Sequence, residues 1–271
     1  MPNTDAIPTA RKVLPIIYVL DTSGSMAGEK IAKVNEAMSE TFEVLKEVAA
    51  NNADAEIKVN VLSFSSGAEW IYPSLISLED YYWNDLTAGG LTDLGEALKE
   101  LDDKLSRSSM LVSSTGFNVP VILFMSDGAP NDNWEKALLE INQNNRWFRA
   151  ATKIAIAVGE DADRDVLEHV VGWLHKDGKI VPSPEAVIQT NDMATLKKLI
   201  KVMSVAGSIL NGQSRPVSKG DNAKEIMDRA IVDVQLGGKD ALTPKPAPAP
   251  SPADSFNKED AWDNDDSTDW T

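Results

Sequence analysis

The stretch from Val13 to Met26 constrains the fold more than any other part of this 271-residue chain. Eight residues that are apolar or aromatic apart from Pro15 end abruptly in the string Asp-Thr-Ser-Gly-Ser, and an amphipathic segment follows from Glu29. A continuous apolar run of this length is typical of a strand buried on both faces, and the spacing of apolar residues in the next segment is typical of a helix. The sequence therefore predicts a buried strand, a tight loop and a helix.

The loop after this strand carries three oxygen-bearing side chains at alternate positions, Asp21, Ser23 and Ser25. Gly24 lies between the serines and lets the backbone turn, so that all three side chains can face one point. One carboxylate and two hydroxyls suit a hard divalent cation, Mg²⁺ first and Ca²⁺ or Mn²⁺ next. Asp and Ser are also the commonest loop and helix-capping residues, so the string taken alone favours a structural role.

Two further stretches present side chains of the same kind. In TAGGLTDLGEAL, residues 87–98, a glycine pair precedes Thr92 at the mouth of a predicted helix, so a loop presents its hydroxyl. In VPVILFMSDGAP, residues 119–130, a second buried strand ends in Ser-Asp-Gly and presents Asp127. Ligands of open α/β sheets bind beyond the carboxyl ends of strands. Because Asp21 and Asp127 both leave strands at that end, the sheet itself favours a metal site.

These three motifs, in this order, resemble the von Willebrand factor A (VWA) domain and its metal-ion-dependent adhesion site (MIDAS). The resemblance covers roughly residues 13–208. It implies one divalent ion, held directly or through water by five side chains: Asp21, Ser23, Ser25, Thr92 and Asp127. It also implies that one coordination position is left for an Asp or Glu carboxylate of a protein partner.

Two local sequence segments indicate one branch of this family. The segments AGGLTDLGEAL and DGAPNDNW resemble the bacterial branch typified by the tellurite-resistance Y protein (TerY). This second resemblance implies a stress-response setting, with Ter-system proteins or a protein kinase and phosphatase pair as partners.

The remaining apolar patterns predict an α/β fold. Helical spacing predicts helices over residues 29–50, 92–105, 133–145 and 192–210, and a short helix that ends at Val171. Apolar runs predict further strands over residues 56–64, 153–159 and 186–188. A turn at residues 65–67 predicts a hairpin into an antiparallel edge strand over residues 69–75. Strands that alternate with helices indicate a doubly wound, mostly parallel, Rossmann-like sheet with helices on both faces.

Composition divides the chain into an N-terminal arm (1–12), the VWA domain (13–210), a linker with an amphipathic helix (211–238) and a C-terminal tail (239–271). The apolar stripe of the helix predicted over residues 222–236 either packs on the domain or binds another protein. The tail combines a proline-rich spacer with an acidic, tryptophan-containing segment, a composition that predicts disorder. This tail is either solubilising or an interaction motif, and its carboxylates could also mask the metal.

The net charge of −16 limits the partners. Nucleic acids and anionic membranes bind basic surfaces, so we expect neither as a partner. The absence of cysteine excludes disulfides and thiolate metal sites and is compatible with a reducing cytosol. The apolar run at residues 13–20 is too short to span a membrane and lacks a signal-peptide cleavage pattern, so we expect a cytoplasmic protein.

The predicted function is a metal-dependent protein-interaction module that is not an enzyme. A metal-dependent phosphohydrolase is one alternative, but Ser23 stands where phosphotransferases with an aspartyl nucleophile usually carry a second Asp. His169 and His175 favour surface or packing roles over catalysis. A second alternative is a scaffold that binds mainly through its C-terminal helix and tail.

Overall fold

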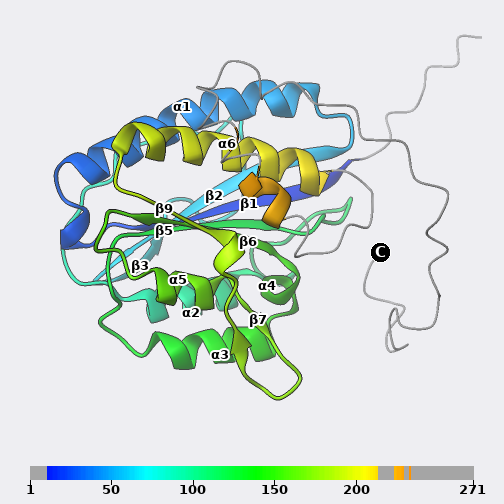
Figure 1. Ribbon diagram of the computed structural model, residues 1–271. Helices are drawn as coiled ribbons and strands as arrows, with labels where there is room; N and C mark the ends of the chain where they lie inside the picture. The colour runs from blue at the N-terminus through cyan, green and yellow to red at the C-terminus, as the bar shows by residue number, and fades with distance from the viewer. Residues whose placement is uncertain (1–10, 213–222, 229–231, 233–271) are drawn as a thin grey trace, which may run out of the picture.

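The computed structural model describes residues 11–212, 223–228 and 232 (Figure 1). Residues 1–10 of the predicted N-terminal arm, most of the predicted linker, the proline-rich spacer and the acidic tail lie outside these residues. Most of the helix predicted over residues 222–236 also lies outside them. In the part that is described, residues 223–228 are helical and bury Ala223, Ile226 and Met227 against the core. This portion of the predicted apolar stripe therefore packs on the domain.

Seven strands of the described residues form one sheet in the order β3-β2-β1-β5-β6-β9, with β4 paired to β2. The parallel strands are β1 (Lys12–Asp21), β2 (Ala55–Ser65), β5 (Val121–Ser126), β6 (Thr152–Val158) and β9 (Val187–Thr190). Two short strands, β3 (Gly67–Trp70) and β4 (Ile76–Ser77), pair antiparallel with β2. The sheet is therefore mostly parallel with an antiparallel edge, as predicted.

Helices cover both faces of the sheet (Figure 1). On one face lie α1 (Glu29–Asn51) and α6 (Met193–Gly212), which pack against each other. On the other face lie α2 (Leu94–Lys104), α3 (Trp134–Asn144), α4 (Arg146–Ala150) and α5 (Arg164–Val170). The predicted doubly wound fold is confirmed. No helix within the described ranges is long and apolar enough to cross a membrane.

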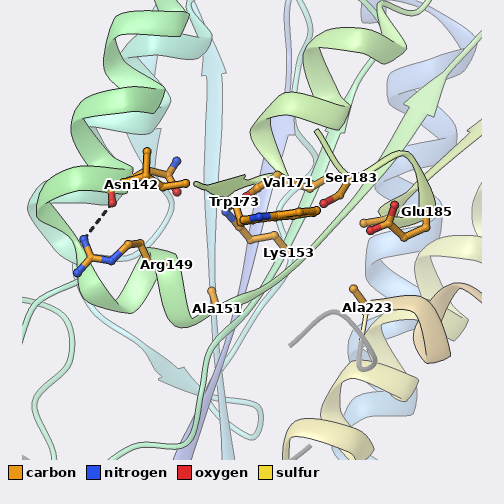
Figure 2. A pocket seen from close by; sticks show the side chains of 12 residues that line it. Asn142, Arg149, Ala151, Lys153, Val171, Trp173, Ser183, Glu185 and Ala223 are labelled. Atoms are coloured by element: carbon orange, nitrogen blue, oxygen red, sulfur yellow. Dashed lines mark hydrogen bonds between the residues drawn. The ribbon is translucent and has the colours of Figure 1, made fainter. Parts of the chain in front are cut away.

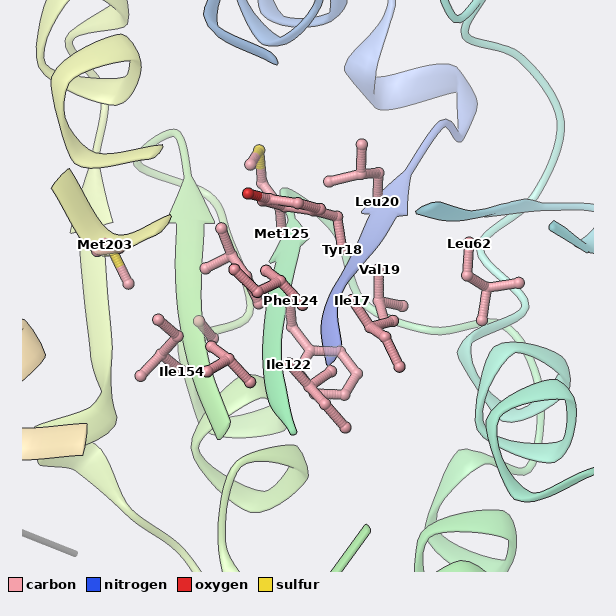
Figure 3. Close-up of a cluster of buried hydrophobic side chains, with 14 of the residues drawn as sticks. Ile17, Tyr18, Val19, Leu20, Leu62, Ile122, Phe124, Met125, Ile154 and Met203 are labelled. Atoms are coloured by element: carbon pink, nitrogen blue, oxygen red, sulfur yellow. The ribbon is translucent and has the colours of Figure 1, made fainter. Parts of the chain in front are cut away.

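The core lies between the two helical layers and is built around β1, where every residue from Val13 to Asp21 is buried. Side chains of β1, β5 and β6 pack together, with Met203 of α6 in the same cluster (Figure 3). In α1, buried residues recur every three or four positions, which gives the helix one apolar face: Ile31, Val34, Met38, Phe42 and Leu45. This apolar face packs α1 against the sheet. The loop between β1 and α1 is therefore fixed at both ends, by the buried strand before it and the packed helix after it.

The structure differs from the predicted elements at the edge strand, at α4 (Arg146–Ala150) and at a short hairpin. The edge strand predicted over residues 69–75 ends at Trp70, because the Asn60 side chain takes over the pairing: its Nδ2 donates to the backbone oxygens of Tyr72 (2.9 Å) and Ser74 (3.0 Å). Pro73, which lies between these acceptors, has no N–H for a sheet ladder. Helix α4 and a separate hairpin of β7 (Trp173–Leu174) and β8 (Ile180–Val181) were not predicted, since both are too short for a periodic pattern.

Candidate metal centre

Two neighbouring parallel strands bring the predicted carboxylates to the same end of the sheet, the one formed by the carboxyl ends of the parallel strands. Strand β1 ends at Asp21 and β5 ends at Ser126, immediately before Asp127, and the two strands pair in register up to Leu20 and Met125. The Ser126 hydroxyl donates to Asp21 Oδ2, which ties the two strand ends together. Both carboxylates are buried, with Asp21 1% and Asp127 4% exposed.

The serines of the loop join the two carboxylates into one hydrogen-bonded cluster. The backbone N–H of Ser23 donates to Asp21 Oδ1 (2.8 Å), and the hydroxyls of Ser23 and Ser25 lie 3.0 Å apart. The Ser25 hydroxyl donates to Asp127 Oδ1 (2.6 Å). Ser23 is buried whereas Ser25 is exposed, so the cluster runs from the sheet edge to the surface. The alternation of ligand-type side chains in the sequence thus becomes a single convergent group.

Thr92 reaches the same cluster from a third segment. A Cβ atom added to Gly128 would lie 3.5 Å from the Ser25 Oγ and 3.8 Å from the Thr92 Oγ1, so both hydroxyls border this glycine. The loop before Thr92 is fastened to the β1–α1 loop by two backbone bonds, Gly24 N to Gly90 O (3.1 Å) and Gly89 N to Thr22 O (2.8 Å). The structure therefore brings together all five residues that the sequence singled out.

Gly90 is required by this docking. Its φ is +88°, and a Cβ atom there would lie 2.7 Å from the Ser66 hydroxyl. That hydroxyl accepts the N–H of Leu91 (3.0 Å), so the space is already taken. Any residue other than glycine would have to strain the backbone and displace Ser66.

Sequence reasoning missed two residues that position Thr92. Asn131 and Thr92 bond reciprocally: the Thr92 N–H donates to Asn131 Oδ1 (2.9 Å), and the Asn131 N–H donates to the Thr92 carbonyl (2.9 Å). The next residue, Asp132, accepts the N–H groups of Gly95 (3.0 Å) and Glu96 (3.1 Å) in the first turn of α2. The segment after Asp127 thus holds the Thr92 loop in place. The adjacent Asn and Asp in this segment were the sequence feature from which these contacts could have been predicted.

Lys30, in the first turn of α1, is a third residue of the site that sequence reasoning missed. Its Nζ forms an ion pair with Asp127 Oδ2. The Asp127 side chain is fully buried and the Lys30 side chain is 31% exposed. An ammonium group is therefore part of the site, and the spacing of the motifs does not predict it.

Comparison with known proteins agrees with this architecture. Residues 16–129 match the model of the von Willebrand factor type A domain family. This part of the chain is a VWA domain. The mouse protein inter alpha-trypsin inhibitor, heavy chain 4, is 28% identical over 131 residues, which cover 46% of this chain and 13% of that protein. Our chain thus spans only a small part of this relative.

Two solved structures share the fold. A von Willebrand factor type A protein from Catenulispora acidiphila has a TM-score of 0.51 at 17% identity, over 72% of this chain and 43% of that one. The PilB minor pilin from Streptococcus sanguinis has a TM-score of 0.54 at 14% identity, over 79% and 65%. At these identities the similarity concerns the fold of the VWA domain alone.

The donor set of the VWA domain fits a hard dication. Burial raises the pKa of Asp21, hydrogen bonds from Ser126 and Ser23 lower it, and the neighbouring carboxylate of Asp127 raises it. Ionised Asp21 is thus disfavoured by desolvation, a penalty that a bound cation would offset. No group of three His, Cys, Asp or Glu side chains within the described ranges could hold a metal ion. The hydroxyls would therefore have to complete the ligand set, and such oxygen ligands suit Mg²⁺, Ca²⁺ or Mn²⁺.

A cavity of about 520 Å³ lies away from this site, near the amino end of β6 (Figure 2). Its charged lining residues include Arg149, Lys153 and Glu185. The Lys153 Nζ donates to the Gly172 carbonyl and lies 4.3 Å from the centre of the Phe148 ring. None of the five predicted ligands lines this cavity.

The contacts of His169 and His175 involve none of the five predicted ligands. The Nδ1 of His169 lies 2.8 Å from the Asp165 carbonyl, and its ring packs edge-on against Trp134. The Nδ1 of His175 lies 3.0 Å from a carboxylate oxygen of Asp177. These are the surface and packing roles predicted from the sequence.

Proposed function

We propose that this VWA domain is a metal-dependent protein-interaction module. Five side chains, Asp21, Ser23, Ser25, Thr92 and Asp127, would hold a divalent cation, and a carboxylate of a protein partner would complete its coordination. The observation that carries the proposal is the convergence of two buried carboxylates and three hydroxyls from three separate loops on one edge of the sheet. Loop capping alone would not require this convergence.

The residues of the site have two roles: hydrogen-bond donors orient the two carboxylates, and the carboxylates supply the negative charge. The Ser126 hydroxyl and the Ser23 N–H hold the two oxygens of Asp21, and the Ser25 hydroxyl holds one oxygen of Asp127. A bound dication would supply an electrophilic centre that accepts one more carboxylate. Because the three hydroxyls are neutral, two carboxylates leave such a centre without net negative charge, so an acidic partner is not repelled. The strong overall acidity of the chain is thus compatible with an acidic partner residue.

The rim of the site suits contact with a protein surface. Ser25 is exposed, and Leu91, the neighbour of Thr92, is 57% exposed. An exposed apolar side chain beside a charged centre can add buried area to a contact whose specificity comes from the carboxylate.

We extend the proposal to the setting of the protein. The motif wording shared with the TerY branch supports a bacterial stress-response role, with tellurium-resistance proteins or a kinase and phosphatase pair as partners. The chain would act in the cytoplasm and without catalysis of its own. The sequence supports this last point, because Ser23 stands where phosphotransferases with an aspartyl nucleophile usually carry a second Asp. The scaffold alternative is less favoured, since Ile226 and Met227 of the C-terminal helix are already buried on the domain.

Calorimetric titration of Mg²⁺ and Mn²⁺ into the metal-free full chain tests the metal site. We expect binding by the wild type, loss of binding in Asp21→Ala, and unchanged binding in Asp54→Ala, which removes an exposed carboxylate at another place. Equal binding by the wild type and Asp21→Ala, or no binding by either, would refute the proposed site.

Peptide display tests the partner chemistry. Selection of a random peptide library on the immobilised full chain in Mg²⁺ should enrich peptides that contain Asp or Glu. The same selection in EDTA should lose that enrichment. Enrichment that is the same in both buffers would show that binding does not pass through the metal.

A further inference from the structure

Lys30 brings into the site a positive charge that the proposed function does not require. It is the second residue of α1, and its Nζ is paired with Asp127 Oδ2. The other oxygen of Asp127 accepts the Ser25 hydroxyl at 2.6 Å. Both oxygens of this buried carboxylate are therefore occupied by groups of the chain itself.

The fold seats the lysine instead of leaving it free in solvent. A Cβ atom on Gly159, directly after β6, would lie 3.4 Å from the Lys30 Nζ and 3.5 Å from its Cε. Gly159 has a φ of +99°, and its N–H donates to the Thr190 carbonyl (2.7 Å), so the loop that flanks the lysine is anchored. The side chain thus lies between the carboxyl end of β5 and that of β6. A long side chain held in this way loses less freedom on pairing than a fully exposed one.

A divalent cation and an ammonium group cannot share Asp127 without repulsion. Both are attracted to the same buried carboxylate, and the interaction of charges is stronger here than at an open surface. A cation that binds Asp127 must therefore move Lys30 away from Oδ2 or accept its repulsion. In either case the ion pair is lost or weakened in the metal-bound state.

We infer that Lys30 is a built-in counter-ion that competes with the divalent cation for Asp127. This inference rests on the proposed function. Lys30 stabilises the metal-free domain by neutralising one of the two buried carboxylates, and it lowers the affinity for the metal by the same interaction. It sets the metal concentration at which the site becomes occupied and able to take a partner carboxylate.

Lys30→Met tests the inference, because it keeps a long apolar stem and removes the charge. Lys33→Met is the matched control: it removes the same charge one turn further along α1, where Lys33 pairs with the exposed Glu36. A hydrogen bond to a charged group corresponds to a factor of about 10 to 100 in an equilibrium constant. We therefore expect Lys30→Met to bind Mg²⁺ and Mn²⁺ about 10- to 100-fold more tightly than the wild type.

The full chain is measured by calorimetry for affinity and by thermal unfolding in EDTA for metal-free stability. Lys30→Met should unfold at a lower temperature in EDTA and be stabilised more by saturating Mg²⁺, while Lys33→Met should change the affinity less than about threefold, as expected of a screened surface charge. Should Lys30→Met fail to fold, Lys30→Gln serves, because its amide can still donate to Asp127.

The outcomes separate the two proposals. If the wild type binds metal, Asp21→Ala does not, and Lys30→Met binds no more tightly than the wild type, the counter-ion inference is overturned and the proposed function stands. If neither the wild type nor Lys30→Met binds metal, both are overturned, and Lys30 is then a permanent partner of Asp127.

Discussion

Substitution of Asp132 by alanine examines how the chain holds Thr92 in the site. Asp132 is half-buried, and its two carboxylate oxygens accept the N–H groups of Gly95 (3.0 Å) and Glu96 (3.1 Å) in the first turn of α2. It caps this helix from a distant segment, and its negative charge also faces the positive end of the helix dipole.

The magnitude follows from these two roles. Loss of a capping side chain costs about 1 kcal/mol, and loss of a favourable charge at a helix amino end costs about 0.3–1 kcal/mol. The free energy of unfolding of Asp132→Ala should therefore fall by about 1–2 kcal/mol. For a domain of this size, that corresponds to a decrease of roughly 2–8 °C in Tm.

Urea unfolding in EDTA, followed by circular dichroism, measures the change without interference from bound metal. Asp132→Asn should fall between the wild type and alanine, since an amide keeps one acceptor and loses the charge. Asp103→Ala is the control, because Asp103 is an exposed carboxylate near the other end of α2. A loss below about 0.5 kcal/mol in Asp132→Ala, or an equal loss in Asp103→Ala, would refute the capping argument.

Three further outcomes are expected. Burial and Asp127 raise the pKa of Asp21, so its contribution to metal-free stability is full below the ordinary pKa of 3.8 and is lost as pH rises through the folded-state value. Asp21→Asn should thus flatten the unfolding free energy against pH in EDTA; an unchanged slope would contradict this. Gly90→Ala should lose about 1–2 kcal/mol by the same urea assay, unlike Gly89→Ala, where a Cβ meets nothing within 4 Å. Thr92→Val should weaken Mg²⁺ binding about tenfold in calorimetry with little change in Tm, and equal affinity would exclude the hydroxyl as a ligand.

Local sequence patterns determined most of the elements and the identity of the candidate ligands. The apolar run before Asp21 and the helical spacing from Ile31 to Leu45 predict β1 and α1 because burial on both faces, or on one helical face, depends on neighbouring residues in the chain. The five oxygen-bearing side chains were likewise recognisable, since each lies at the end of a strand or in a loop that leads into a helix. The metal they would hold and the carboxylate they would bind stay predictions.

Only the tertiary structure decided which charges and caps surround these ligands. Lys30 and Asp127 are 97 positions apart, and Asp132 caps α2 by accepting the N–H of Gly95, which lies 37 positions earlier in the chain. The edge strand stops at Trp70 because the side chain of Asn60, from the neighbouring strand, takes the place of a backbone partner. Such pairings depend on how loops meet once the sheet has formed, and no periodic pattern records them. By itself, therefore, the sequence determined most of the strands and helices and the choice of candidate ligands, while the packed fold decided that an ammonium group lies beside them.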